Sequence, residues 1–150
     1  MKMVERNPYS HSASVGRKVR GFTLIELVVV VAIVAILATI AFASYQSSIT
    51  KSRRAAAANC LQGNAQFMER YYTTHMSYFV AATPPVLSQC QDLGPFYTVG
   101  FEAGPTPTAY TLRAVPLASQ LANDTLCGTL SLTQQGVRGE TGTGTPNDCW

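Results

Sequence analysis

The stretch Gly21-Phe22-Thr23-Leu24-Ile25-Glu26 stands where a basic leader meets a long apolar run. After Glu26, no charged residue occurs until Lys51. A helix needs about 20 apolar residues to cross a bilayer, so this run is long enough to do so. A lone carboxylate at the edge of such a run is costly unless it has a partner and a task. The stretch therefore predicts a membrane helix in which Glu26 has a specific role.

The charge of the chain is placed unevenly. Residues 1–21 carry a net charge of +4, whereas residues 22–150 carry a net charge of −1. Binding to DNA requires a stripe of Lys and Arg that neutralises phosphates. Because the basic residues are concentrated in the leader, nucleic acid is not expected as a partner.

The leader also indicates how the chain is processed. Arg17, Lys18 and Arg20 favour a cytoplasmic N-terminus, although three further cations at 51–54 weaken this inference. An ordinary secretory signal has a short apolar core followed by its cleavage site. Here the run is too long, and the plausible cut lies before it, at Gly21. Such a cut would leave the apolar helix on the mature protein.

The cysteines indicate disulfide bonds rather than a metal site. An even number of cysteines in a small exported domain predicts a disulfide framework, and three pairings are possible. The sequence contains no CxxC motif, and the two histidines, His11 and His75, do not cluster with the cysteines. No nucleophile–base arrangement, phosphate-binding loop or pair of carboxylates occurs either, so neither enzymatic activity nor a cofactor is expected. The four cysteines are Cys60, Cys90, Cys127 and Cys149.

The hydrophobic pattern predicts one long helix followed by strands. Residues 22–74 contain no Pro, and apolar residues recur at spacings of three and four in the second half of this span. Residues 75–95 are rich in turn formers and predict a loop. Alternating segments predict strands at 96–101, 108–115 and 126–133, with a short strand at 137–138. The polar tail 139–148 is expected to wander unless Cys149 holds it. This order predicts an α+β fold, a helix on three or four antiparallel strands.

The motif at residues 21–26, on its basic leader, closely resembles the processing site of type IV prepilins. The C-terminal pattern from Cys127 to Trp150 resembles that of minor pilins of the PilE type. The resemblance implies the pilin fold, cleavage between Gly21 and Phe22 by the prepilin peptidase, and methylation of the new Phe22 amine. It divides the chain into a leader (1–21), the transmembrane half of the helix (22–50) and a periplasmic domain (51–150).

The resemblance also implies roles for Glu26 and the cysteines. Glu26 would pair with the Phe22 amine of a neighbouring subunit, and a mispaired helix would leave both charges buried without a partner. The implied disulfides are Cys60–Cys90 and Cys127–Cys149, of which the second would close a loop over the tail. The implied partners are other pilins, the prepilin peptidase and the assembly platform. The chain would span the inner membrane once before joining an extracellular pilus.

The function expected from these features is that of a minor pilin that supports pilus biogenesis, adhesion and twitching motility. A pseudopilin of type II secretion is an alternative, because it shares the N-terminal motif. A pilin that captures DNA for uptake is a weaker alternative because of the charge balance. An uncleaved domain with a permanent membrane anchor shares the apolar run but gives no role to the motif.

Overall fold

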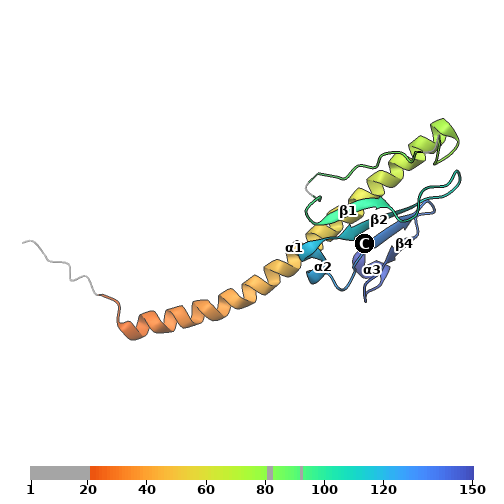
Figure 1. The fold of residues 1–150 in the computed structure, drawn as a ribbon. Coiled ribbons are helices and arrows are strands. Elements are labelled where there is room, and N and C mark those ends of the chain that lie inside the picture. The colour runs from red at the N-terminus through yellow and green to blue at the C-terminus, as the bar shows by residue number, and fades with distance from the viewer. Residues whose placement is uncertain (1–20, 81–82, 92) are drawn as a thin grey trace, which may run out of the picture. The chain divides into compact units, whose positions relative to one another are not determined.

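The structure is a computed structural model that describes residues 21–80, 83–91 and 93–150. Its described part contains a long helix, two short helices and four strands (Figure 1). In chain order these elements are α1 (Leu24–His75), β1 (Tyr97–Phe101), β2 (Thr111–Pro116), α2 (Ala118–Asn123), β3 (Leu130–Thr133), β4 (Arg138–Glu140) and α3 (Pro146–Cys149).

The chain divides into two compact units between Ala38 and Thr39. The described residues of the first unit are apolar except for Thr23 and Glu26, and they are exposed. They belong to α1, the one helix in the described part that is long and apolar enough to cross a membrane. We call the second unit, residues 39–150, the head.

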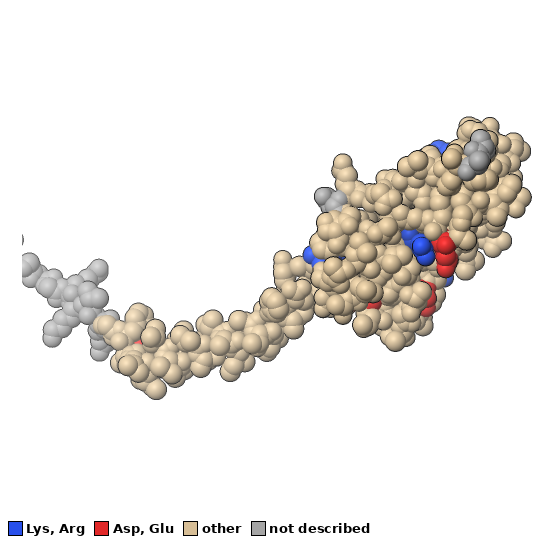
Figure 2. All heavy atoms as spheres, in the orientation of Figure 1, with Lys and Arg blue, Asp and Glu red and all other residues tan. Residues whose placement is uncertain are grey.

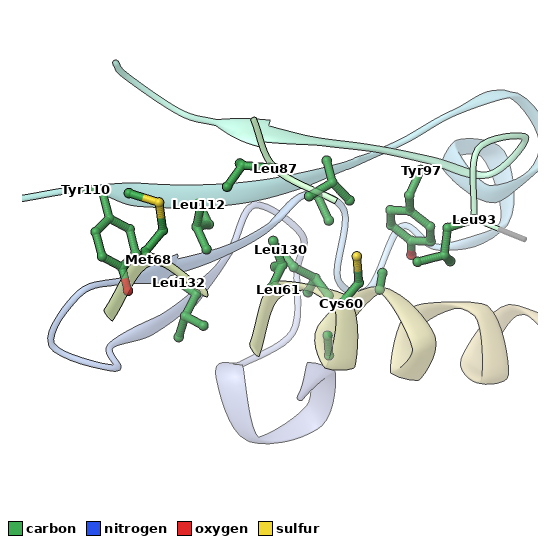
Figure 3. Packing of buried hydrophobic residues seen from close by; sticks show 14 of the residues in the cluster. Cys60, Leu61, Met68, Leu87, Leu93, Tyr97, Tyr110, Leu112, Leu130 and Leu132 are labelled. Atoms are coloured by element: carbon green, nitrogen blue, oxygen red, sulfur yellow. The ribbon is translucent and has the colours of Figure 1, made fainter. Parts of the chain in front are cut away.

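The sheet of the head is antiparallel, with the strand order β1-β2-β3-β4. Alternate residues of each strand face α1, as a strand with one buried face requires. Leu112 of β2 and Leu130 of β3 are completely buried, and they meet Leu61 and Met68 of α1 (Figure 3). This arrangement is the α+β fold expected from the sequence, with four strands.

One expectation for the C-terminal third was wrong. The strand expected at 126–133 begins only at Leu130, because Gly128 has a φ of +57° that breaks an extended run. The tail 139–148 contributes to β4 and α3, and a disulfide bond joins Cys149 at its end to Cys127. Helix α3 begins with a capping box, in which Thr145 and Asp148 exchange hydrogen bonds. Gly142 packs so closely on Leu126 that a Cβ there would lie 2.2 Å from its carbonyl oxygen.

A side chain bonds to the backbone of each edge strand. The Gln89 amide donates to the carbonyl oxygen of Val99 in β1 over 2.9 Å and accepts from the Val99 N–H over 3.4 Å. On the opposite edge, the indole N–H of Trp150 donates to the Gly139 carbonyl oxygen of β4 over 3.2 Å. Both edges of the sheet therefore have some of their backbone groups satisfied within the same chain.

A buried polar network joins α1 to α2 and β1. Arg54 Nη1 donates to Asp124 Oδ1 over 2.6 Å, and both side chains are almost completely buried. The other carboxylate oxygen accepts from the Tyr97 hydroxyl and from the Gln120 amide. The same amide also donates to the carbonyl oxygen of Thr50 on α1. Asp124 thus satisfies donors from three elements that are distant in sequence.

A second polar cluster lies where the end of α1 meets the sheet. The hydroxyls of Tyr78 and Tyr110 both donate to the carboxylate of Glu69, over 3.0 Å and 2.9 Å. Burial and the hydrogen bond to this carboxylate raise the pKa of Tyr78 to about 12, and they raise that of Tyr110 too. The aromatic residues here therefore hold the helix end on the sheet.

We expect the head to lose stability as the pH rises from about 10 to about 12. Unfolded tyrosine has a pKa of about 10, whereas burial raises the pKa of Tyr78 and of Tyr97 to about 12. A group with a raised folded pKa stabilises the fold fully below its unfolded pKa and loses that contribution above it. Melting temperatures from circular dichroism, measured together with tyrosinate absorbance, would show unfolding and ionisation together. Ionisation of all tyrosines near pH 10 with no loss of melting temperature would contradict the prediction.

Candidate functional site

The residues expected to act in processing and assembly lie at the start of α1. Gly21 and Phe22 precede the helix, and the Phe22 side chain is 85% exposed. Glu26 lies in the first turn, and its backbone N–H donates to the Thr23 hydroxyl over 3.3 Å. No ion pair to Glu26 occurs within the described part of the chain. The Glu26 side chain is exposed.

The four cysteines form two disulfide bonds in the structure. One joins Cys60 on α1 to Cys90 in the loop before β1, and the other joins Cys127 to Cys149 at the end of α3. Asn64 strengthens the first attachment, because its amide bonds both the carbonyl oxygen and the N–H of Ser88. Within residues 21–80, 83–91 and 93–150, no group of three His, Cys, Asp or Glu could hold a metal ion.

The face of the sheet turned away from α1, which we call the outer face, carries an arginine among small residues of the neighbouring strands. Arg113 of β2 pairs with Gly100 of β1 and with Ser131 of β3, which in turn pairs with Gly139 of β4. Arg113 alternates with the buried Leu112, so its exposed side chain lies on the face turned away from α1. With glycine at both ends of the row, a ligand could approach the backbone beside this guanidinium.

Hydroxyl groups surround Arg113 on the same face. On one side of the Arg113 row, Thr98 of β1 pairs with Val115 of β2. On the other side, Thr111 of β2 pairs with Thr133 of β3. Hydroxyls of Ser and Thr and backbone N–H groups are common donors to phosphate oxygens. The outer face is thus a flat polar surface that offers one fixed cation and several neutral donors.

A second exposed arginine, Arg138 of β4, lies on the other face of the sheet, because it pairs with Leu132, which faces α1. The Arg138 guanidinium stands 5.4 Å from the ring centroid of Trp150. The sequence analysis placed Arg113 on a strand but gave it no role, because its neighbours in the row come from three other strands.

Charged side chains are sparse on the head. On the face drawn in Figure 2, Lys and Arg side chains lie singly, and some lie beside Asp or Glu. This face shows no broad basic patch. Any anion bound by the head would therefore be held by a few cations together with neutral donors.

Two protein-family models match the chain, one over its N-terminal part and one over most of the head. Residues 43–131 match the family model described as "Type IV minor pilin ComP, DNA uptake sequence receptor". Residues 16–42 match the model described as a prokaryotic N-terminal methylation motif. The first match covers the part of α1 within the head together with β1, β2 and α2. No curated protein matches the chain significantly in sequence.

A solved pilin structure shares this fold. The non-core minor pilin PilV of Neisseria meningitidis is 25% identical to the chain, with a TM-score of 0.51, and the match covers 64% of this chain and 90% of that one. A type IV pilin from Shewanella oneidensis is 29% identical, with a TM-score of 0.49, and the match covers 67% and 97%.

Proposed function

This chain belongs to the family of type IV minor pilins, and from that premise we propose that its head is a receptor for double-stranded DNA during uptake. Pilins are structural proteins of the membrane and the pilus rather than enzymes. The match of residues 43–131 to a family described as a DNA uptake sequence receptor carries the proposal. It counts against the expectation that nucleic acid is not a partner.

The outer face of the sheet supports this proposal chemically. Phosphate contacts position a protein on a duplex, and they come from Arg, from hydroxyls and from backbone N–H groups. Arg113 supplies the cation, and Thr98 and Ser131 supply hydroxyls beside it. The glycine positions Gly100 and Gly139 let a duplex backbone come close to the sheet.

Processing and assembly are part of the same proposal. Cleavage between Gly21 and Phe22 would release the leader (1–21), and methylation would follow on the Phe22 amine. Glu26 would pair with that amine on a neighbouring subunit, and the head would face the periplasm before it joins the pilus. Roles in biogenesis, adhesion or twitching would follow from incorporation, whereas the comparisons give no support to the pseudopilin alternative.

We expect the head to bind duplex DNA with a weak dependence on salt. Each neutralised phosphate contributes about −0.9 to the slope of log K against log salt, so the single arginine of the outer face, Arg113, predicts a slope of about −1. Arg113→Gln should weaken binding and reduce the magnitude of this slope by about 1. The measurement is fluorescence anisotropy of a labelled duplex with the full chain in detergent micelles, over a series of salt concentrations.

Arg70→Gln provides the matched control, because it removes an equally exposed arginine from α1 rather than from the outer face. It should leave both the affinity and the slope unchanged. Equal losses in the two variants would indicate general attraction between charges and would contradict the proposed interface. Competition between genomic DNA of the source organism and unrelated DNA would show whether binding depends on sequence.

A further inference from the structure

A hollow of about 320 Å³ lies in the head beside the part of α1 that follows the apolar run. One wall is a face of α1, which contributes Ala43, Gln46 and Lys51. The other wall is the chain after α2, which contributes Asn123 and Leu126. The hollow therefore has apolar side chains on both walls and polar groups from both. Neither processing nor DNA binding uses it.

The charges around this hollow favour an anion. Lys51 is exposed, and Arg54, which is almost completely buried, also lines the hollow. Asp124 lines it too, but its carboxylate already accepts from Arg54, Tyr97 and Gln120. The Arg54–Asp124 pair is neutral as a unit, so Lys51 gives the hollow its net positive charge. The hydrogen bond from Arg54 to Asp124 is made by Nη1, one of the three nitrogen atoms of the guanidinium group.

The position of these residues along the helix matches the headgroup layer of a membrane. The apolar residues 22–42 suffice for the hydrocarbon core, which takes about 20 residues. Tyr45 is 62% exposed, as expected for an aromatic side chain at a membrane interface. Gln46 is the next residue after Tyr45. Lys51 lies about 12 Å beyond Ala43 along the helix axis, at a rise of about 1.5 Å per residue. A lysine side chain can extend back toward the interface from there.

We propose that this hollow binds the headgroup of an anionic phospholipid, phosphatidylglycerol, in the leaflet on the side of the head before the chain enters a filament. Lys51 and Arg54 contact the phosphate, and the amides of Gln46 and Asn123 contact the glycerol hydroxyls. Ala43 and Leu126 contact the first carbons of the lipid below the phosphate. Assembly would then require the lipid to leave or to travel with the subunit. This inference does not depend on DNA binding.

Lys51 makes the proposal testable, because it is the only lysine after the leader. The full chain in detergent micelles is titrated with dihexanoylphosphatidylglycerol, and bound lipid is counted by native mass spectrometry. We expect Lys51→Gln to weaken binding roughly fivefold, the effect of about 1 kcal/mol for one cation near anionic lipid. In the wild-type chain, the same lipid should slow acetylation of Lys51, measured by peptide mass spectrometry.

Arg53→Gln is the matched control, because Arg53 stacks on Phe96 at 3.6 Å and does not line the hollow. It should leave lipid binding unchanged, and Lys51→Arg should restore it. Equal loss in Arg53→Gln and Lys51→Gln would mean diffuse attraction and would overturn the proposal. Equal protection by dihexanoylphosphatidylcholine, or by inorganic phosphate alone, would overturn it too. Protection of Lys51 from acetylation that appears without lipid as the protein concentration rises would also overturn it, since that outcome assigns the hollow to a second copy of the chain.

Discussion

Replacement of Asp124 by alanine should destabilise the head by about 3–5 kcal/mol, the cost of breaking a buried ion pair from one side. The Arg54 guanidinium would remain almost completely buried without its carboxylate, and the Tyr97 hydroxyl and the Gln120 amide would each lose an acceptor. A domain is typically stable by 5–15 kcal/mol in total, so the loss is a large fraction. Urea unfolding of the full chain in micelles, followed by circular dichroism, measures it.

Two further variants decide whether the ion pair is the cause. Glu102→Ala removes an exposed carboxylate and should change stability by less than about 0.5 kcal/mol. The double variant Arg54→Met with Asp124→Leu removes both charges and should recover most of the loss, because no buried charge is left without a partner. A loss below about 1 kcal/mol for Asp124→Ala would show that solvent reaches Arg54.

Replacement of Glu26 by glutamine should exclude the subunit from filaments, if Glu26 pairs with the Phe22 amine as proposed. Glutamine keeps the shape of the side chain but removes the charge that would compensate a buried amine. A cost of about 3–5 kcal/mol corresponds to a loss of incorporation of more than a hundredfold. Quantitative immunoblots of sheared-filament and membrane fractions measure the ratio.

The N-terminal mass of the Glu26→Gln subunit in the membrane separates assembly from processing. A mature N-terminus at Phe22, together with absence from filaments, is the expected combination. Glu26→Asp keeps the charge on a shorter side chain and should enter filaments better than Glu26→Gln. Incorporation of Glu26→Gln at the wild-type ratio would refute the proposed pair, and an intact leader in the wild type would refute cleavage at Gly21.

Local patterns were enough to predict most of the fold. The long helix followed from a span without Pro, and the burial of Leu112 and Ala114 against the exposure of Arg113 followed from simple alternation. Helix α2 was missed because its stabilising contacts are distant: Gln120 bonds the backbone of Thr50, 70 residues earlier in the chain. The late start of β3 was missed because alternation does not reveal a positive φ at Gly128.

The candidate DNA interface could not be predicted in the same way. Net charge counts every residue equally, and the slightly acidic balance of residues 22–150 argued against DNA. A surface depends instead on which residues the register brings together. The row of Gly100, Arg113 and Ser131 becomes visible only when three strands are aligned. The N-terminal motif, in contrast, is contiguous, so the sequence alone was sufficient to locate Gly21 and Glu26.

The two side chains bonded to the sheet edges also affect whether copies of the head can pair through their sheets. Gln89 occupies both hydrogen-bonding groups of Val99, and Trp150 occupies the Gly139 carbonyl oxygen. An open sheet edge can pair with the edge of another copy and so lead to aggregation. With these edge groups already bonded within the chain, copies of the head are less prone to join edge to edge at high concentration.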